Sequence, residues 1–269
     1  MTPVLELRDV SAAYGPFRAL FEISLTVGEG EAVALLGANG VGKTTVARVA
    51  SGLVAPSSGT VSVGGVDLTG APVWRYARAG IAHAPEGRSV FATLSVEDNL
   101  LLSFRRSKGR RAAPAALEKA FELFPALGDR PRQLAGTLSG GQQRMLSMAR
   151  VMVEEPALLI ADELSLGLAP IVVDQVYESL DRLRASGTAL LIVEQHVPHA
   201  LSLCDRAVLL DHGAVAWEGS SAEAGEVVTE QLFRQPSDEI PEAAETPEAT
   251  AAEAGETPEA AETTEAAEA

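Results

Sequence analysis

The stretch EAVALLGANGVGKTT, residues 31–45, decides the fold of this chain. It opens with an apolar run typical of a buried strand, continues into the pattern GxxxxGK[ST], and leads into a helical pattern. Gly37, Gly40 and Gly42 let backbone N–H groups turn toward phosphate oxygens, and the start of the following helix adds a favourable dipole. The stretch therefore predicts a phosphate-binding loop between a strand and a helix.

Two side chains of this loop have predicted roles of their own. Lys43 is expected to reach the β and γ phosphates, and Thr44 is expected to ligate magnesium. The expected nucleotide contacts within the loop are Gly37, Ala38, Asn39, Gly40, Val41, Gly42, Lys43 and Thr44. The alternative is a glycine-rich turn that holds no nucleotide. Taken alone, the loop suits a kinase, a GTPase or an ATP-driven machine equally well.

Around the loop, short β-rich runs alternate with helical patterns. Strand signals lie at 4–10, 19–27, 31–36, 80–83, 157–161 and 188–193, and helical patterns lie near 42–52, 95–104, 114–124, 139–153 and 170–184. The later strands are continuous apolar runs, as in central parallel strands. The sequence therefore predicts an α/β fold with a parallel core, an N-terminal antiparallel β subdomain, and a helical subdomain inserted at about 87–155.

The acidic residues of this sequence are unevenly distributed along the chain. The net charge is −16, but eleven of the 37 acidic residues and none of the 21 basic ones follow Ser237. Residues 237–269 repeat ETPEA and contain one large apolar residue, so we predict a disordered tail, with a solubilising role as the alternative to a docking one. The body, residues 4–236, is only mildly acidic, which argues against a nucleic-acid surface.

The chain also lacks signals for disulfides and for membrane insertion. Its single cysteine, Cys204, cannot form an internal disulfide, and there is no CxxC to frame a zinc site. No run of 18 apolar residues occurs, and the N-terminus has no apolar leader region. We therefore expect a reducing compartment, and any membrane role would need a partner that spans the bilayer.

The run ALLIADE ends a predicted strand with two carboxylates, Asp162 and Glu163. The first is suited to hold magnesium, and the second is suited to polarise an attacking water. Paired acids at a strand end also occur in ordinary turns. Together with the phosphate loop, they favour nucleotide hydrolysis, with Glu163 as the catalytic base.

The run LSGGQQRMLSMAR, residues 138–150, supplies a second glycine-rich helix start. A small hydroxyl and bare backbone amides make another anion site there. LSGGQ followed by ALLIADE closely resembles the ATP-binding cassette family over about residues 4–236. The resemblance implies that this signature contacts the γ-phosphate held by an opposing subunit's phosphate loop. The signature residues are Ser139, Gly140, Gly141 and Gln142.

Other roles follow from the same resemblance. Tyr14 matches the aromatic residue that stacks on adenine, although a packing role is the alternative, and Thr45 matches the residue beside the α-phosphate. In IAHAPEGRSVFATLSVEDNL, residues 81–100, the position of a usual magnesium-sensing glutamine is Glu86. A carboxylate can still ligate magnesium. A solvated loop acid is the alternative reading of Glu86.

The stretch TALLIVEQH, residues 188–196, leaves two candidates for the switch position of the family. That position lies ten residues before an Asp-Arg pair, and counting back from Asp205 gives Gln195 rather than His196. Neighbouring side chains at a strand end face opposite ways. We therefore expect Gln195 to approach the γ-phosphate, and because an amide cannot take up a proton, proton acceptance falls on Glu163.

PEGR, LSVEDNL and SLGLAP look like the branch of cassettes that serves branched-chain amino acid importers. The implied protein is an ATP- and Mg²⁺-dependent ATPase subunit at the cytoplasmic face of the cell membrane. Its implied partners are transmembrane permease subunits, a second ATPase subunit and, indirectly, an extracytoplasmic solute-binding protein, without nucleic acid. The alternatives are an importer for urea, amides or another small solute, and a soluble cassette ATPase.

Overall fold

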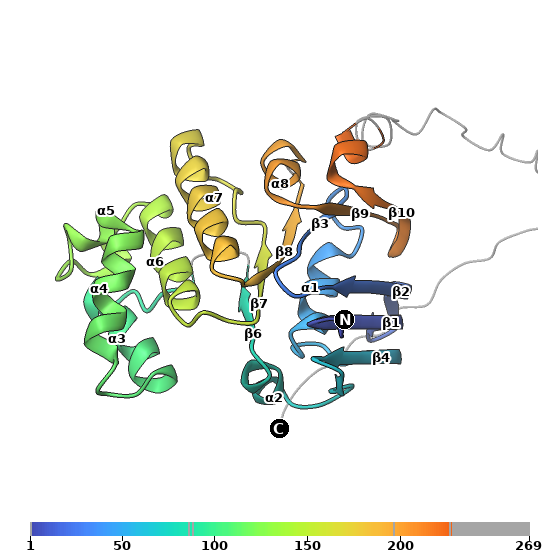
Figure 1. Cartoon of the computed structure of the whole chain (residues 1–269), viewed down its shortest axis with the longest axis horizontal. Coiled ribbons are helices and arrows are strands. Elements are labelled where there is room, and N and C mark those ends of the chain that lie inside the picture. The colour runs from blue at the N-terminus through green and yellow to red at the C-terminus, as the bar shows by residue number, and fades with distance from the viewer. Residues whose placement is uncertain (1, 86, 88, 196, 226, 228–269) are drawn as a thin grey trace, which may run out of the picture. The chain divides into compact units, whose positions relative to one another are not determined.

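The computed structural model describes residues 2–85, 87, 89–195, 197–225 and 227, in which strands and helices alternate (Figure 1). The elements are β1 (Leu5–Tyr14), β2 (Phe17–Val27), β3 (Ala32–Leu36), α1 (Lys43–Ala50), β4 (Ser58–Val63), β5 (Val66–Asp67), α2 (Val73–Arg78), β6 (Ile81–Ala84), α3 (Val96–Ser107), α4 (Ala113–Leu123), α5 (Pro125–Gly128), a 3-10 turn (Ala135–Thr137), α6 (Gly140–Met152), β7 (Leu158–Asp162), α7 (Pro170–Ala185), β8 (Ala189–Glu194), α8 (Val197–Leu203), β9 (Arg206–Asp211) and β10 (Ala214–Ser220).

The central sheet has six strands in the order β10-β9-β3-β8-β7-β6. β3 pairs in parallel with β8 and β9, and β7 pairs in parallel with β6 and β8. All five residues of β3 are buried, and they alternate between two cores: Ala34 packs on one face of the sheet and Leu35 on the other. This double burial explains the continuous apolar runs, because both faces of the sheet are covered.

The second sheet is antiparallel, in the order β2-β1-β4-β5. β1 runs to Tyr14 rather than ending near Val10 as the sequence pattern indicated, because it passes through irregular register beside Asp9, whose φ is +50°. α1 contributes buried residues, such as Val46, to the core that this sheet shares with the six-stranded sheet. The predicted α/β class with an N-terminal antiparallel sheet is confirmed.

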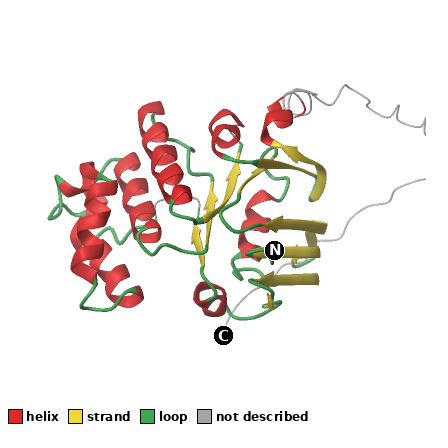
Figure 2. Cartoon of the chain, in the orientation of Figure 1, coloured by secondary structure: helices red, strands yellow, loops and turns green. Residues whose placement is uncertain are grey.

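Helices α3, α4, α5 and α6 lie between β6 and β7 in the chain and form the group of helices at the left of Figure 2. Ser95 caps α3 by accepting a hydrogen bond from the Asp98 N–H. Phe104 and Leu146 are fully buried in the core shared by these helices and one face of the central sheet. The inserted helices therefore pack onto the strands that lead into the site.

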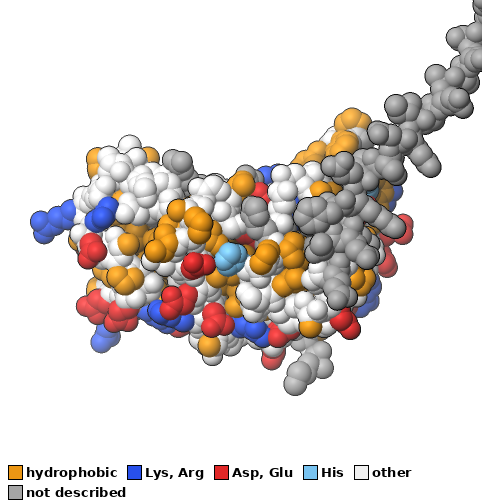
Figure 3. Space-filling model, turned by 90° about the horizontal axis from the view of Figure 1, so that it is seen from above, with side chains coloured by type: hydrophobic (Ala, Val, Ile, Leu, Met, Phe, Trp, Pro, Cys, Tyr) orange, Lys and Arg blue, Asp and Glu red, His pale blue; other side chains and the backbone are white. Residues whose placement is uncertain are grey.

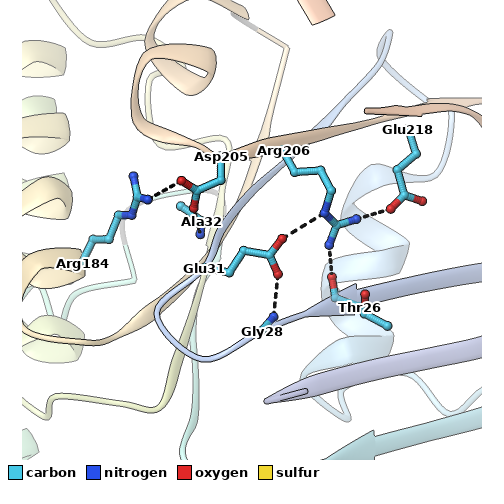
Figure 4. Close-up of polar contacts among 8 residues, drawn as sticks. All are labelled: Thr26, Gly28, Glu31, Ala32, Arg184, Asp205, Arg206 and Glu218. Carbon is cyan, nitrogen blue, oxygen red and sulfur yellow. Dashed lines mark hydrogen bonds and ion pairs between the residues drawn. The ribbon is translucent and has the colours of Figure 1, made fainter. Parts of the chain in front are cut away.

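Charged side chains tie the two sheets together at the N-terminal edge of β3 (Figure 4). Arg206 donates to the Glu31 carboxylate at 2.9 Å and to the Thr26 carbonyl at 2.6 Å, and it also pairs with Glu218. The neighbouring Asp205 carboxylate accepts from the Ala32 N–H at 3.0 Å and from the Arg184 guanidinium at 2.5 Å. The Asp-Arg pair is therefore a structural junction that fixes β9 against β3.

Three further features complete the fold. Cys204 is buried in the core, and burial raises its pKa to about 12. Within the described part of the chain, no helix is both long and apolar enough to cross a membrane. The predicted disordered tail, residues 237–269, lies outside the described residues.

Candidate nucleotide-binding and catalytic site

The phosphate loop connects β3 to α1 at the C-terminal edge of the central sheet. Gly42 is the N-cap of α1 with φ +107°, a left-handed conformation that favours glycine, and no side chain caps the helix. At Gly37, an added Cβ would lie 2.5 Å from the Leu210 carbonyl oxygen, so β9 leaves no room for a side chain. The first amides of α1 therefore remain available for an anion.

Lys43 lies at the centre of this loop and is only 3% exposed. Its Nζ donates to the carbonyl oxygens of Gly37 and Ala38, both at 2.9 Å, and lies 3.9 Å from Oε1 of Glu163. Burial lowers the pKa of Lys43 below its usual value, and the carboxylates of Glu163 and Asp162 oppose this shift. The ammonium group thus lies between the loop and the carboxylates at the end of β7.

The predicted magnesium ligands of the core lie side by side. Thr44 Oγ1 donates to Oδ1 of Asp162 at 3.4 Å, across 118 residues of sequence. Both groups offer oxygen, the ligand that a hard divalent cation prefers. The described residues contain no cluster of three or more His, Cys, Asp or Glu side chains that could hold a metal ion. The third predicted ligand, Glu86, lies outside the described residues.

Glu163 follows β7 directly, and its backbone is unusual. Its φ is +47°, in the left-handed region that residues other than glycine rarely adopt. Its N–H donates to the Val193 carbonyl at 2.8 Å, and its own carbonyl oxygen accepts from Arg144 Nη2 at 2.5 Å. The side chain is 16% exposed, so the predicted base is partly accessible to water.

A small cavity collects most of the predicted nucleotide contacts. It has a volume of about 160 Å³ and is lined by Tyr14, Phe17, Ala19, Gly40, Gly42, Lys43, Thr44, Thr45 and Glu163. Tyr14 is 42% exposed, so its ring is free to stack on a base. Phe17, 68% exposed, was not identified from the sequence as a contact, although it follows the turn at Gly15-Pro16. Two aromatic rings therefore border the phosphate loop.

The signature lies at the start of α6 and does not line that cavity. Ser139 and Gln142 form a capping box: Ser139 Oγ accepts from the Gln142 N–H at 3.3 Å, and Gln142 Oε1 accepts from the Ser139 N–H at 3.1 Å. Gly141 faces α7, where an added Cβ would lie 3.2 Å from Val172. Gly140 lines a separate cavity of about 180 Å³ that also includes Glu163.

Gln195 follows the end of β8 and is exposed. Because β8 lies between β3 and β7, this position is at the edge where the phosphate loop and Asp162 also lie. The preceding residue, Glu194, is 1% exposed and accepts from both the N–H and the Oγ of Ser165, at 2.9 and 2.8 Å. The rival candidate, His196, lies outside the described residues.

Sequence reasoning also missed two buried charged residues. Glu194 ties the end of β8 to the loop after β7, and Arg144 in α6 donates to backbone carbonyls on both sides of the site. Arg144 lies in LSGGQQR, two residues after the signature glutamine, and Glu194 precedes the predicted switch residue. Position beside a motif was therefore the only signal, and it did not show which backbone groups they contact.

The geometry agrees with comparisons to known proteins. A family model described as "ABC transporter" matches residues 20–165, more than half of the chain. The chain therefore belongs to the ABC transporter family, and it is the ATP-binding, ATP-hydrolysing component rather than the membrane-spanning one.

Among curated relatives, the ATP-binding protein BraG of high-affinity branched-chain amino acid transport in Pseudomonas aeruginosa is 41% identical, covering 81% of this chain and 94% of that protein. The probable branched-chain amino acid transport protein LivF of Archaeoglobus fulgidus is 33% identical, covering 82% and 93%. The lipopolysaccharide export protein LptB of Escherichia coli is also 33% identical, covering 81% and 91%.

A solved structure supports the fold directly. An ATP-binding subunit of an ABC transporter superposes with a TM-score of 0.75 at 27% sequence identity, covering 84% of this chain and 93% of that one. The two sheets and the inserted helices described above are thus those of an ABC ATPase.

Proposed function

We propose that this chain is one of two ATPase subunits that energise an importer for branched-chain or other hydrophobic amino acids at the cytoplasmic face of a membrane. The proposal is supported by the motifs PEGR, LSVEDNL and SLGLAP and by the 41% identity to BraG, which exceeds the 33% identity to the exporter component LptB. The residues of this chain do not themselves define the solute, because selectivity resides in the binding protein and the permease, so the proposed solute rests on these likenesses alone.

The observation that carries the two-subunit part is the separation of the two anion-binding helix starts. The phosphate loop lines one cavity, whereas the signature Ser139 lies outside it on a capped helix. A single chain thus provides two separate parts of an ATP site, the phosphate loop and the signature, which do not line the same cavity. We propose that two chains meet head to tail, so that each signature completes the other's phosphate loop.

Within such a site the residues of this chain have distinct tasks. Lys43 and the α1 amides would hold the phosphates, and Tyr14 would stack on the base. Glu163 would take a proton from the attacking water, while Gln195 would donate a hydrogen bond to the γ-phosphate. Because an amide does not titrate, only Glu163 of these two residues can accept the proton.

Magnesium fits this arrangement. Thr44 Oγ1 and the Asp162 carboxylate lie 3.4 Å apart, beside the loop that would bring phosphate oxygens. A magnesium ion is usually bound through one or two protein oxygens together with substrate phosphates, and when bound it neutralises developing charge on them. We propose that Thr44 and Asp162 hold this ion, with Glu86 as a further ligand.

A groove between the core and the inserted helices is our proposed docking site for the permease. It has a volume of about 600 Å³, and its lining includes residues of β6, α3 and α6. Phe91 is 46% exposed at this groove, with the Arg150 guanidinium 5.0 Å from its ring centre. Pro85 and Ser89 line the groove, and in sequence they belong to a stretch that resembles the segment that contacts the membrane partner in related cassettes.

The first test concerns catalysis. Glu163→Gln keeps the shape of the side chain but removes the proton acceptor, so we expect ATP affinity to stay near wild type while kcat falls at least about 100-fold. Nucleotide binding and steady-state hydrolysis measure the two quantities. Substantial remaining turnover would refute the assignment of Glu163.

The second test concerns the solute. Deletion of the gene should abolish high-affinity uptake of labelled leucine by cells, and wild type, but not Glu163→Gln, should restore it. Loss of urea or amide uptake with normal leucine uptake would favour the rival importer.

On the described face in Figure 3, acidic and basic side chains are interspersed, which does not favour a cassette acting on nucleic acid. Normal uptake of every solute would support such a non-transport cassette.

A further inference from the structure

The catalytic geometry depends on a strained backbone. Glu163 has φ +47°, and a non-glycine residue keeps such a conformation only when its surroundings hold it there. The Glu163 N–H donates to the Val193 carbonyl at 2.8 Å, and the Glu163 carbonyl accepts from Arg144 Nη2 at 2.5 Å and, at the longer distance of 3.4 Å, from the Leu166 N–H. The shortest of these hydrogen bonds is therefore donated by a side chain, that of Arg144.

That side chain, Arg144, lies in α6 and is 5% exposed. Its Nη2 also donates to the Asp162 carbonyl at 3.0 Å. Its Nη1 donates to the carbonyls of Pro85, at 3.0 Å, and Gly87. A guanidinium is planar and rigid, so these four carbonyl oxygens are held in one fixed arrangement.

The four carbonyls belong to two segments that are far apart in sequence. Residues 162–163 carry the predicted magnesium ligand and the predicted base, whereas Pro85 and Gly87 follow β6, and Pro85 lines the groove together with Phe91. Arg144 itself extends from the helix that begins at the signature. A displacement of Pro85 or Gly87 would therefore move the guanidinium that also holds Glu163.

We propose that Arg144 is a positioning residue that keeps Glu163 in its left-handed conformation and makes that conformation depend on the positions of Pro85 and Gly87. This inference rests on the proposed role of Glu163 as the base. It adds that one buried guanidinium connects the docking groove to the catalytic carboxylate through backbone carbonyls. Arg144 positions Glu163 and does not contact the nucleotide, so its replacement should lower kcat and leave nucleotide affinity unchanged.

The test uses Arg144→Lys in the full chain, with Arg144→Gln as a second variant. Lysine keeps the charge but loses the fork, so we expect kcat to fall roughly 10- to 100-fold, with the KM for ATP within about twofold of wild type. In the Glu163→Gln background, the same change should lower the residual rate no further. The matched control is Arg184→Lys, because Arg184 also donates to a backbone carbonyl, at 2.6 Å, but at the structural junction.

The outcomes separate this proposal from the previous one. High turnover in Glu163→Gln would overturn the base assignment and this inference together. If Glu163→Gln is inactive but Arg144→Lys and Arg144→Gln keep wild-type kcat, only the role of Arg144 is wrong. Equal losses of kcat in Arg144→Lys and Arg184→Lys, at equal thermal stability, would show a general structural effect and would also contradict it.

The dependence on Pro85 and Gly87 has its own test. Gly87 has φ +95° with open space around it, so Gly87→Ala strains the backbone without a clash. We expect kcat to fall roughly three- to tenfold in wild type and not to fall in Arg144→Lys. Gly109→Ala, at φ +84° and equally open between α3 and α4, should leave kcat unchanged. An equal loss from Gly87→Ala in both backgrounds would disprove the coupling.

Discussion

Helices α1 and α6 both begin at a glycine-rich turn, but their first backbone amides are satisfied in different ways. The N-cap of α1 is Gly42, which offers no side chain, whereas the N-cap of α6 is Ser139, whose hydroxyl accepts from the Gln142 N–H. The first start is therefore open to an anion, and the second is closed by its own side chains. The difference suggests that α1 binds nucleotide within one chain, while α6 is stable alone and binds phosphate only when another chain brings it.

The largest effect is expected from a change at the start of α1, the start that is open to an anion. Lys43→Ala removes a buried cation that would pair with the phosphates, so nucleotide affinity of the isolated chain should fall roughly 100- to 1000-fold. Calorimetric titration with ATP measures it. The closed start provides the control: Ser139→Ala should bind ATP like wild type. Equal losses in both variants would show that the two starts share one pocket within a chain.

A smaller effect should follow from a change at the start of α6, the start that is closed by its own side chains. Ser139→Ala removes the hydroxyl that would contact the charged γ-phosphate of the other chain's ATP, so kcat should fall roughly 10- to 100-fold. The matched control is Ser95→Ala at the start of α3, where Ser95 Oγ accepts from the Asp98 N–H at 3.0 Å. Each change should cost about 1 kcal/mol of unfolding free energy.

Unfolding in urea and steady-state hydrolysis separate the two contributions. If Ser95→Ala reduces hydrolysis as much as Ser139→Ala does, the loss comes from weakened helices rather than from a missing phosphate contact.

A third pair of variants tests which residue after β8 contacts the γ-phosphate bound at the start of α1. Gln195→Ala should lower kcat about tenfold, because one hydrogen bond to the γ-phosphate is lost. His196→Ala should have little effect. Hydrolysis by the two variants, measured at saturating ATP, decides between them: if only the histidine change abolishes turnover, the count from Asp205 is one residue out of register.

The smallest effect concerns the other end of α1. Ser51 Oγ, at the C-cap, donates to the Ala47 carbonyl at 2.9 Å and lies 3.0 Å from His83 Nδ1, and burial lowers the pKa of His83 to about 4. Because the unfolded chain then binds a proton that the folded chain does not, stability declines as pH falls from about 6.5 toward 4. Between pH 7 and 5.5, wild type should lose about 1 kcal/mol more than His83→Gln.

Urea unfolding at the two pH values measures this difference. An identical pH dependence in wild type and His83→Gln would show that His83 ionises equally in both states. Hydrolysis at pH 7 serves as the control, since the neutral ring lies outside the phosphate loop.

The elements that carry long apolar runs were predicted well, and the reason is burial. Residues 157–161 and 188–193 were predicted as strands, and β7 and β8 lie within one residue of those bounds. The segments β4, α2, β9 and β10 were among those not identified. β4 reads SGTVSV and α2 has only six residues, so neither has a strong periodic signal. β9 has a short apolar run and β10 alternates between exposed and half-buried positions, but neither was recognised as a strand.

The candidate site divides in a similar way. The phosphate loop and the acids at the end of β7 were predictable, because their spacing is local and the chemistry demands it. The roles of Arg144 and Glu194 were not, because each contacts groups that only the folded chain brings near: Arg144 reaches the Pro85 carbonyl across 59 residues, and Glu194 reaches Ser165 across 29. Such contacts follow from the packing of α6 and β8 and have no sequence pattern of their own.

The buried cysteine has a practical consequence. Cys204 is 7% exposed, and its pKa of about 12 leaves almost no thiolate at neutral pH, which is the form that alkylating dyes attack. A second cysteine introduced at an exposed position, such as Leu166 in the loop after Glu163, would therefore be the one that reacts. The approach of two chains could then be followed by fluorescence energy transfer in a protein that keeps its native thiol.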